Sequence, residues 1–208
     1  MRVRSGRVFT VVIVLLIYFS SAVADDALKQ RLHAVSKHIL NEQNGVSSTK
    51  DKQEIDFREQ RYSELLAEPT VFSGKLVYEP VTRTMSKVVT QPDNISMSMT
   101  EKAVVIESSA GKRRLSLRAR PALRAILAGF RALVEGDVEA LQSYFEIEYE
   151  NNNDNWQLFL TPSGKRLARR LTSLTISGQD KQVNSIVTIM TNGDRQHMTL
   201  TPVATVNE

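Results

Sequence analysis

The chain has 208 residues, 41% of them hydrophobic, and its 27 Lys and Arg against 23 Asp and Glu give a formal net charge of +4. It contains no cysteine, which excludes disulfides, thiol nucleophiles and thiolate metal sites. Residues 1–24 hold three arginines and no acid, so removing them lowers the charge from +4 to +1. The charge therefore gives no argument for a nucleic-acid partner.

The first segment has the features of an export signal. Three arginines precede an apolar run at residues 8–19, and the small residues AVA at 22–24 form a cleavage site. The run is shorter than the about 20 residues of a membrane-spanning helix, which favours cleavage over a retained anchor. We predict a signal peptide at 1–24 and one domain at 25–208, located in a Gram-negative periplasm.

Alternating apolar and polar residues predict strands through most of the first half. An amphipathic helix at 25–40 and a polar loop come first, and then the period changes to two. In one segment, for example, Ile95, Met97 and Met99 share a face. Turn residues separate six predicted strands, at 55–65, 70–79, 84–90, 94–100, 102–108 and 113–119.

A helical period interrupts the strands in the middle of the chain. Pro121 suits a helical first turn and Gly136 a helix end, and a second short helix is predicted at 138–143 with Asp137 as its cap. Segments 178–180 and 192–194 have the composition of hairpin turns. Five more strands are predicted at 145–151, 155–162, 170–177, 182–190 and 195–202.

This order of elements predicts an α+β fold. Short connections favour antiparallel neighbours, and so many strands in one domain favour a strongly curved sheet, an incomplete β-barrel. The apolar stripe of the central helix makes that helix the natural cover for the concave face, so we expect a sheet with covering helices.

No group of residues indicates catalysis. The chain has no G-x-S-x-G motif, and His33 and His38 are five apart, which is the wrong spacing for a metal pair on one helix. Glu146, Glu148 and Glu150 alternate as the wet side of a strand does. The segment PSGKRLARR at 162–170 lacks the pattern of a phosphate loop and is interpreted as a turn before a basic strand start. We predict no enzyme, no metal and no cofactor.

The apolar residues on the strands and on the central helix are the candidates for ligand binding. Each of them taken alone is ordinary core, but methionine is flexible and suits surfaces that accept varied apolar shapes. The candidate lipid-binding residues are Phe72, Leu76, Tyr78, Ile95, Met97, Met99, Ile126, Leu127, Phe130, Trp156, Leu158, Leu160, Met190, Met198 and Leu200.

Several segments resemble, in order, those of the LolA family of periplasmic lipoprotein carriers. They are FREQRYSELLAEPTVFSGKLVYE at 57–79, TQPDNISMSMTEKAVVIES at 90–108, NWQLFLTP at 155–162, and the closing hairpins at 171–201. The resemblance implies an open, incomplete barrel whose concave apolar face is lidded by helices. It further implies a monomeric carrier of lipoprotein acyl chains or free lipid, moving from an inner-membrane donor to an outer-membrane acceptor.

Two departures from the family pattern concern the segment before the T-Q-P turn. The family's principal carriers have an Arg-Pro pair there whose arginine contacts the lid, and the nearest arginine in this chain is Arg83. Lys87 stands where the family has Trp. The chain resembles a divergent branch of the family. The alternative from the residues alone is a non-catalytic envelope scaffold protein, with a filled core and no lipid cargo.

Overall fold

The structure is a computed structural model that describes residues 52–120, 123–124, 127–128, 137–152, 154–180 and 182–202. The predicted signal peptide and first helix lie outside these residues. No helix within the described ranges is both long and apolar enough to span a membrane.

The described residues form one 11-stranded antiparallel sheet, which confirms the six strands before the middle segment and the five strands after it. The order is β6-β5-β4-β3-β2-β1-β11-β10-β9-β8-β7, so each half is a meander and the first and last strands pair in the middle. The strands are β1 Gln53–Tyr62, β2 Thr70–Glu79, β3 Thr84–Gln91, β4 Ile95–Met99, β5 Ala103–Ser108, β6 Gly111–Ser116, β7 Phe145–Asn152, β8 Asn155–Pro162, β9 Leu171–Gln179, β10 Gln182–Met190 and β11 Arg195–Pro202.

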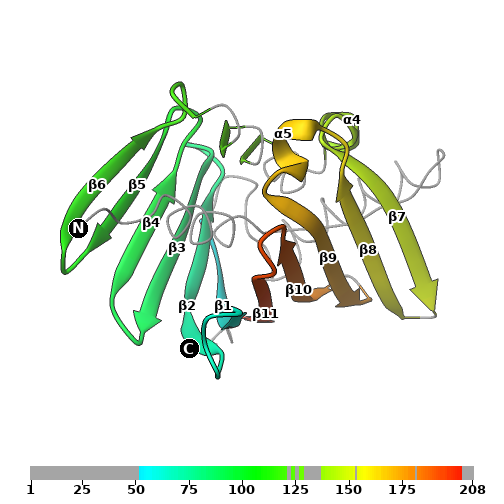
Figure 1. Ribbon diagram of the computed structural model, residues 1–208, viewed down its shortest axis with the longest axis horizontal. Coiled ribbons are helices and arrows are strands. Elements are labelled where there is room, and N and C mark those ends of the chain that lie inside the picture. Colours follow the sequence, from blue (N-terminus) through cyan, green and yellow to red (C-terminus); the bar gives the residue numbers. More distant parts are fainter. Residues whose placement is uncertain are drawn as a thin grey trace.

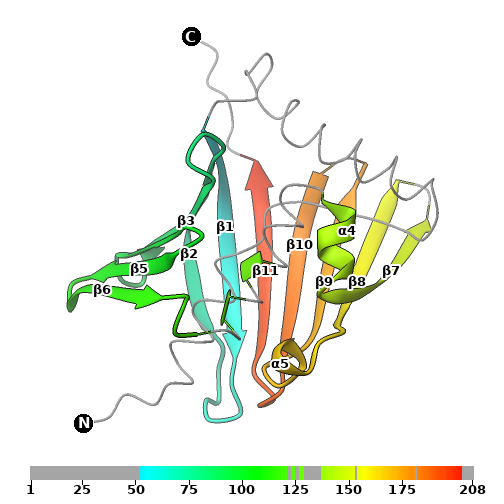
Figure 2. The same cartoon turned by 90° about the horizontal axis from the view of Figure 1, so that it is seen from above.

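The sheet bends strongly, so that strands β2–β6 and strands β7–β10 form two walls with β1 and β11 between them (Figures 1 and 2). Because side chains alternate along each strand, one set of positions faces the space between the walls; we call this the inner face. Residues of both walls, such as Leu76 and Leu158, belong to one buried cluster. The core of the molecule therefore lies on the inner face.

The short helix after the central segment forms as predicted. Helix α4 spans Val138–Gln142, and the backbone N–H of Ala140 donates a hydrogen bond of 3.0 Å to the side chain of Asp137. Of the predicted central helix, the described residues Leu123, Arg124, Leu127 and Ala128 are helical. Leu123 and Leu127 are buried in the core cluster and Arg124 is exposed, as the predicted apolar stripe requires.

The interpretation of residues 162–170 as a turn before a strand is wrong. A second short helix, α5 at Lys165–Ala168, lies there, and β9 begins only at Leu171. The N–H groups of Leu167 and Ala168 both donate to the carbonyl of Gly164. The Leu167 side chain is buried in the core, which gives this basic segment the single apolar anchor that turns it inward.

Several strand ends also differ from the prediction, among them those of β1 and β9. The first strand ends at Tyr62, because the N–H of Leu66 closes a turn by donating to the carbonyl of Ser63 at 3.0 Å. The reversal predicted at 178–180 begins later, because Gly178 and Gln179 are still part of β9. The ring of Trp156 occupies the place where a Cβ on Gly178 would stand.

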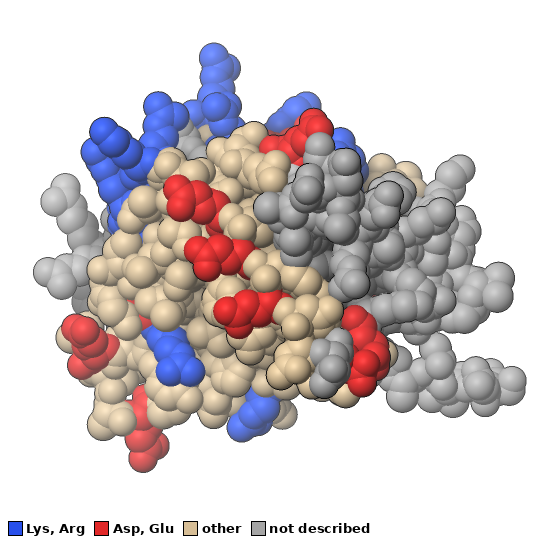
Figure 3. All heavy atoms as spheres, turned by 90° about the vertical axis from the view of Figure 1, so that its right-hand side faces the viewer, with Lys and Arg blue, Asp and Glu red and all other residues tan. Residues whose placement is uncertain are grey.

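The two edge strands of the sheet, β6 and β7, carry exposed charges of opposite sign. Lys112, Arg113 and Arg114 are exposed on β6, whereas β7 exposes Glu146, Glu148 and Glu150, the alternating acids of the sequence. A line of acidic side chains crosses the side of the molecule on which β7 lies (Figure 3). Charges on edge strands oppose pairing with further strands.

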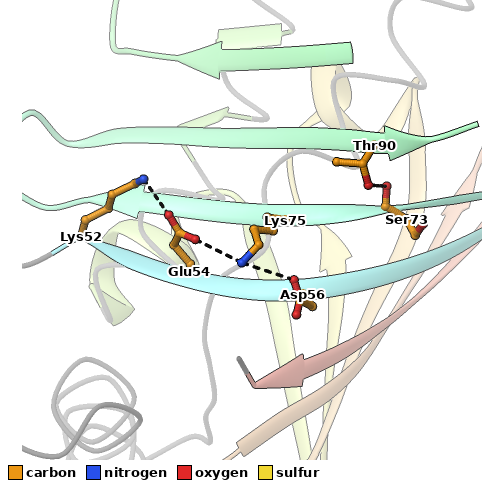
Figure 4. A network of polar contacts seen from close by, with 6 residues as sticks. All are labelled: Lys52, Glu54, Asp56, Ser73, Lys75 and Thr90. Atoms are coloured by element: carbon orange, nitrogen blue, oxygen red, sulfur yellow. Dashed lines mark hydrogen bonds and ion pairs between the residues drawn. The ribbon is translucent and has the colours of Figure 1, made fainter. Parts of the chain in front are cut away.

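The outer face of β1 and β2 is polar, as the alternation predicts. Glu54 accepts from Lys52 at 2.6 Å and from Lys75 at 3.4 Å, and the ammonium of Lys75 lies 3.8 Å from Asp56 (Figure 4). Beside these ion pairs, Thr90 donates to the carbonyl of Ser73. The charged side chains are at least one-third exposed, so each ion pair contributes about 1 kcal/mol or less.

Candidate functional site

Most of the predicted lipid-binding residues lie together on the inner face. They come from both walls, and nearly all have less than one-tenth of their surface exposed. Fully or almost fully buried are Leu76, Tyr78, Met97, Met99, Leu127, Trp156, Leu158, Leu160, Met190, Met198 and Leu200. Phe72 and Ile95 are partly buried, and Ile126 and Phe130 lie outside the residues whose side chains the structure describes.

The degree of burial divides the side chains of the inner face into those that pack the core and those that a guest molecule could contact. Met97, Leu158 and Leu160 are 0% exposed, so their surfaces are already covered by other atoms of the chain. Phe72 and Ile95 pack against the same cluster but keep part of their surface open. A guest molecule would meet such partly buried side chains first. Further ones on or beside the inner face are Ile106, Leu115, Tyr144, Ile147 and Tyr149.

The described residues line a groove near strand ends in each half of the sheet. One of about 480 Å³ is lined mainly by polar residues of β7, β8 and β9 around Trp156, whose ring N–H donates to the carbonyl of Asp180 at 3.0 Å. The other, of about 570 Å³, lies at the ends of β3, β4 and β5 and includes Val89 and Ile95. The second groove therefore opens beside one of the predicted binding residues.

Arg83, the predicted lid contact, lies in the turn between β2 and β3. Its backbone has φ +50°, and its side chain is 53% exposed. Its guanidinium lies 3.8 Å from the carboxylate of Glu101. The contact of Arg83 with a lid stays a prediction.

The inner face also carries charges that the sequence analysis missed. Glu59 and Lys87 are both 0% exposed and form an ion pair, and the other carboxylate oxygen of Glu59 pairs with Arg61. We call Glu59, Arg61 and Lys87 the inner charged cluster. The Lys87 ammonium lies 4.4 Å from the ring centroid of Phe57, and the Arg61 guanidinium 4.0 Å from that of Phe72.

The strand register explains how these residues meet. Lys87 stands opposite Leu76 on β2, which stands opposite Ile55 on β1, so Glu59 is four positions further along β1. The long lysine chain spans this offset by crossing the ring of Phe57. Gly74 stands opposite Phe57 on β2 and adds no side chain there, and a Cβ on it would lie 1.9 Å from the carbonyl oxygen of Val88.

Burial lowers the pKa of Lys87 from 10.5 to about 7. The loss of water around the ammonium is the largest cause, and the nearby positive charge of Arg61 acts in the same direction. The carboxylate of Glu59 opposes both effects through its charge and its hydrogen bond. Lys87 can therefore lose its proton near neutral pH, where an exposed lysine stays protonated.

A signal for this cluster was present in the sequence. Lys87 lies between Met85 and Val89 at the inward positions of β3, and Glu59 follows Ile55 and Phe57 at those of β1. A charged residue at an apolar position of a period-two pattern indicates a buried charge with a partner. The sequence does not name the partner, because that depends on the register between strands.

No three His, Cys, Asp or Glu side chains in the described ranges are grouped so that they could hold a metal ion. His197 lies half-buried on the outer face, where it shares a hydrogen bond of 2.9 Å with Ser185. His33 and His38 lie outside the described residues.

Sequence comparison identifies the family. Residues 42–207 match the family described as outer membrane lipoprotein carrier protein LolA-like. Because the match covers most of the chain, the protein belongs to this LolA-like family, as the resemblance of its motifs implied. No match was found among curated proteins.

The solved structures that match this chain share little sequence with it. A LolA superfamily protein from Nitrosomonas europaea is 9% identical with a TM-score of 0.40, and the alignment covers 83% of this chain and 91% of that one. A domain from Vibrio parahaemolyticus, whose name refers to outer membrane lipoprotein sorting, is 8% identical with a TM-score of 0.43 over 86% and 93%. LprF from Mycobacterium bovis is 10% identical with a TM-score of 0.35 over 86% and 95%. The family assignment therefore depends on the sequence match.

Proposed function

We propose that the protein binds the hydrocarbon chains of a lipid or of a lipid-modified protein on the inner face of its sheet, and carries them through the periplasm towards the outer membrane. The observation that carries this proposal is the family match over residues 42–207. The open, curved sheet supports the proposal, because its apolar inner face is a surface against which a hydrocarbon chain could pack.

The energetics of transfer support a carrier without chemistry. Each CH₂ group exposed to water costs about 0.8 kcal/mol, so an acyl chain does not leave a membrane unaided at a useful rate. A protein that only covers the chain removes most of this cost. Release then needs a partner or membrane that covers the chain better, because equilibria shift only through differential affinity.

Uptake of a fluorescent fatty acid by the purified protein tests the proposal. Ile95 and Ser96 are neighbours that are both half-buried but point to opposite faces of β4. We expect Ile95→Asp to weaken uptake at least about tenfold, because it places a charge against the hydrocarbon. Ser96→Asp serves as the control and should bind like the unsubstituted protein. Met97 is unsuitable for this test, because at 0% exposure its substitution would disturb folding as well.

A scaffold protein that binds an envelope partner is the second candidate function. The observation in its favour is the near-complete burial of most inner-face side chains, which a filled core also explains. The exposed basic residues Lys165, Arg166, Arg169 and Arg170 around α5 would then contact an acidic partner. This candidate predicts no fatty acid uptake and a salt-sensitive envelope partner in pull-downs, lost when these four residues are replaced by Gln.

A further inference from the structure

The inner charged cluster has one positive charge more than its own residues can neutralise. It contains two cations, Arg61 and Lys87, and one carboxylate, that of Glu59. The residues opposite Glu59 are Phe72 and Met198, which are uncharged. Those opposite Lys87, Leu76 and Met97, are uncharged as well, so none of these four opposite positions brings a second carboxylate.

The cluster also has more hydrogen-bond donors than acceptors. An ammonium has three N–H donors and a guanidinium five, whereas Glu59 offers two oxygens. Within the described residues, Lys87 donates to one oxygen of Glu59 and Arg61 reaches the other through Nε, which leaves the outer nitrogens of the guanidinium unused in this pair. A further acceptor would therefore find donors already held in place.

Stability alone does not explain these charges. Replacing a buried ion cluster by apolar residues of similar size is often neutral or stabilising, because desolvation offsets the attraction. The cluster is reached from one side, since the Arg61 side chain is 15% exposed and lies one residue before the end of β1. Phe57, Phe72 and Leu76 make the surroundings apolar.

We infer that the inner charged cluster binds the anionic head group, a carboxylate or a phosphate, of an amphiphile whose hydrocarbon chain lies along the inner face. Arg61 provides the first contact at the open side of the cluster, and Lys87 supplies the buried charge. The inference depends on the proposed function and adds to it a class of ligand with an acid at one end.

Probes that differ only in the head group test the inference. A fatty acid with a fluorophore near its tail is compared with its methyl ester and with the alkyl phosphate of the same chain, at about pH 6.5, where a carboxylate is ionised. We expect the acid or the phosphate to bind at least about tenfold more tightly than the ester, as for a hydrogen bond to a charged group. The tighter of the two identifies the head group.

The variants locate the preference. Lys87→Met and, at the more accessible position, Arg61→Gln should each reduce the preference to about twofold or less, because each weakens binding of the acid or the phosphate more than binding of the ester. Lys75→Met removes an exposed lysine of the outer face and should keep the full preference. Ester binding shows that each variant is folded, and Arg61→Gln decides the matter if Lys87→Met does not fold.

Each outcome has a distinct meaning. Equal binding of the acid, the phosphate and the ester overturns the inference and leaves the proposed function standing. Binding of none of the probes overturns both. A preference for the acid or the phosphate that survives in Arg61→Gln also overturns the inference, because the head group would then lie elsewhere.

Discussion

Glu59 and Lys87 are held by each other in a place where neither charge would be stable alone. Both side chains are fully buried, and their pairing depends on the register of three strands. Glu54, only five residues before Glu59, also pairs with lysines but lies on the outer face with one-third of its side chain exposed. The same kind of interaction therefore has a different energy on the two faces of β1.

Glu59→Gln should destabilise the protein by about 3 kcal/mol, because Arg61 and Lys87 lose the buried carboxylate that compensates their charge. Glu54→Gln is the matched control and should cost about 1 kcal/mol or less, since water screens that ion pair. Urea denaturation of the two variants measures the difference. Equal losses of unfolding free energy would show that the pair at Glu59 is not buried as described.

The lowered pKa of Lys87 predicts a dependence of stability on pH. In the unfolded chain the lysine keeps its proton up to about its ordinary pKa of 10.5, whereas in the folded protein it loses the proton above a pKa of about 7. The unfolded state thus binds more protons between these values, and the unfolding free energy rises from pH 7 towards pH 10.

Lys87→Met should lack this rise, because the titrating group is gone. Lys75→Met, on the outer face, should keep it. Denaturation midpoints at a series of pH values for the three proteins measure the effect. If the unfolding free energy of Lys87→Met rises by the same amount, groups other than Lys87 cause the rise.

The strands were predictable from the sequence, because alternation along one segment is a local property. The burial of Met97 and Met99 and the exposure of Glu146 and Glu148 follow directly from it. Contacts between distant segments were not predictable in this way. The Glu59–Lys87 pair, for example, depends on the register of β1 with β2 and of β2 with β3. Helix α5 was missed because four residues are too few to show a helical period.

Helix α5 is held by one side chain, and this makes a clear prediction. Leu167→Ala should cost about 2–5 kcal/mol of stability, because Leu167 is buried in the core. Leu65→Ala makes the same chemical change in the loop after β1, where the side chain is 89% exposed, and should change stability by about 0.5 kcal/mol or less. Thermal unfolding compares the two; a small effect at Leu167 would contradict its role as the anchor.

The close approach of β2 and β3 at Gly74 predicts a second pair of effects. Gly74→Ala should destabilise the sheet by about 2 kcal/mol or more, since the new Cβ meets the backbone oxygen of Val88. Gly164→Ala, before α5, places its Cβ in open space and should be nearly neutral. Urea midpoints report both, and a neutral Gly74→Ala would mean that the strands are further apart there.

At the scale of the whole molecule, the arrangement of the sheet decides what the inner face can do. The first and last strands pair in the middle of the sheet, and β6 and β7 are its two edge strands. The exposed charges on these two edges have opposite signs. A sheet of this kind can widen at its open side, whereas a closed barrel keeps its diameter. We expect this side to be where a hydrocarbon chain enters.

The most direct test of lipid binding is mass spectrometry of organic extracts from the protein, purified from periplasm without detergent. We expect an amphiphile bound in amounts approaching one per protein molecule, enriched over an extract of an unrelated periplasmic protein, and depleted in Ile95→Asp but not in Ser96→Asp. A protein that carries no lipid when isolated, and takes up none when offered a fatty acid, would contradict the proposed function.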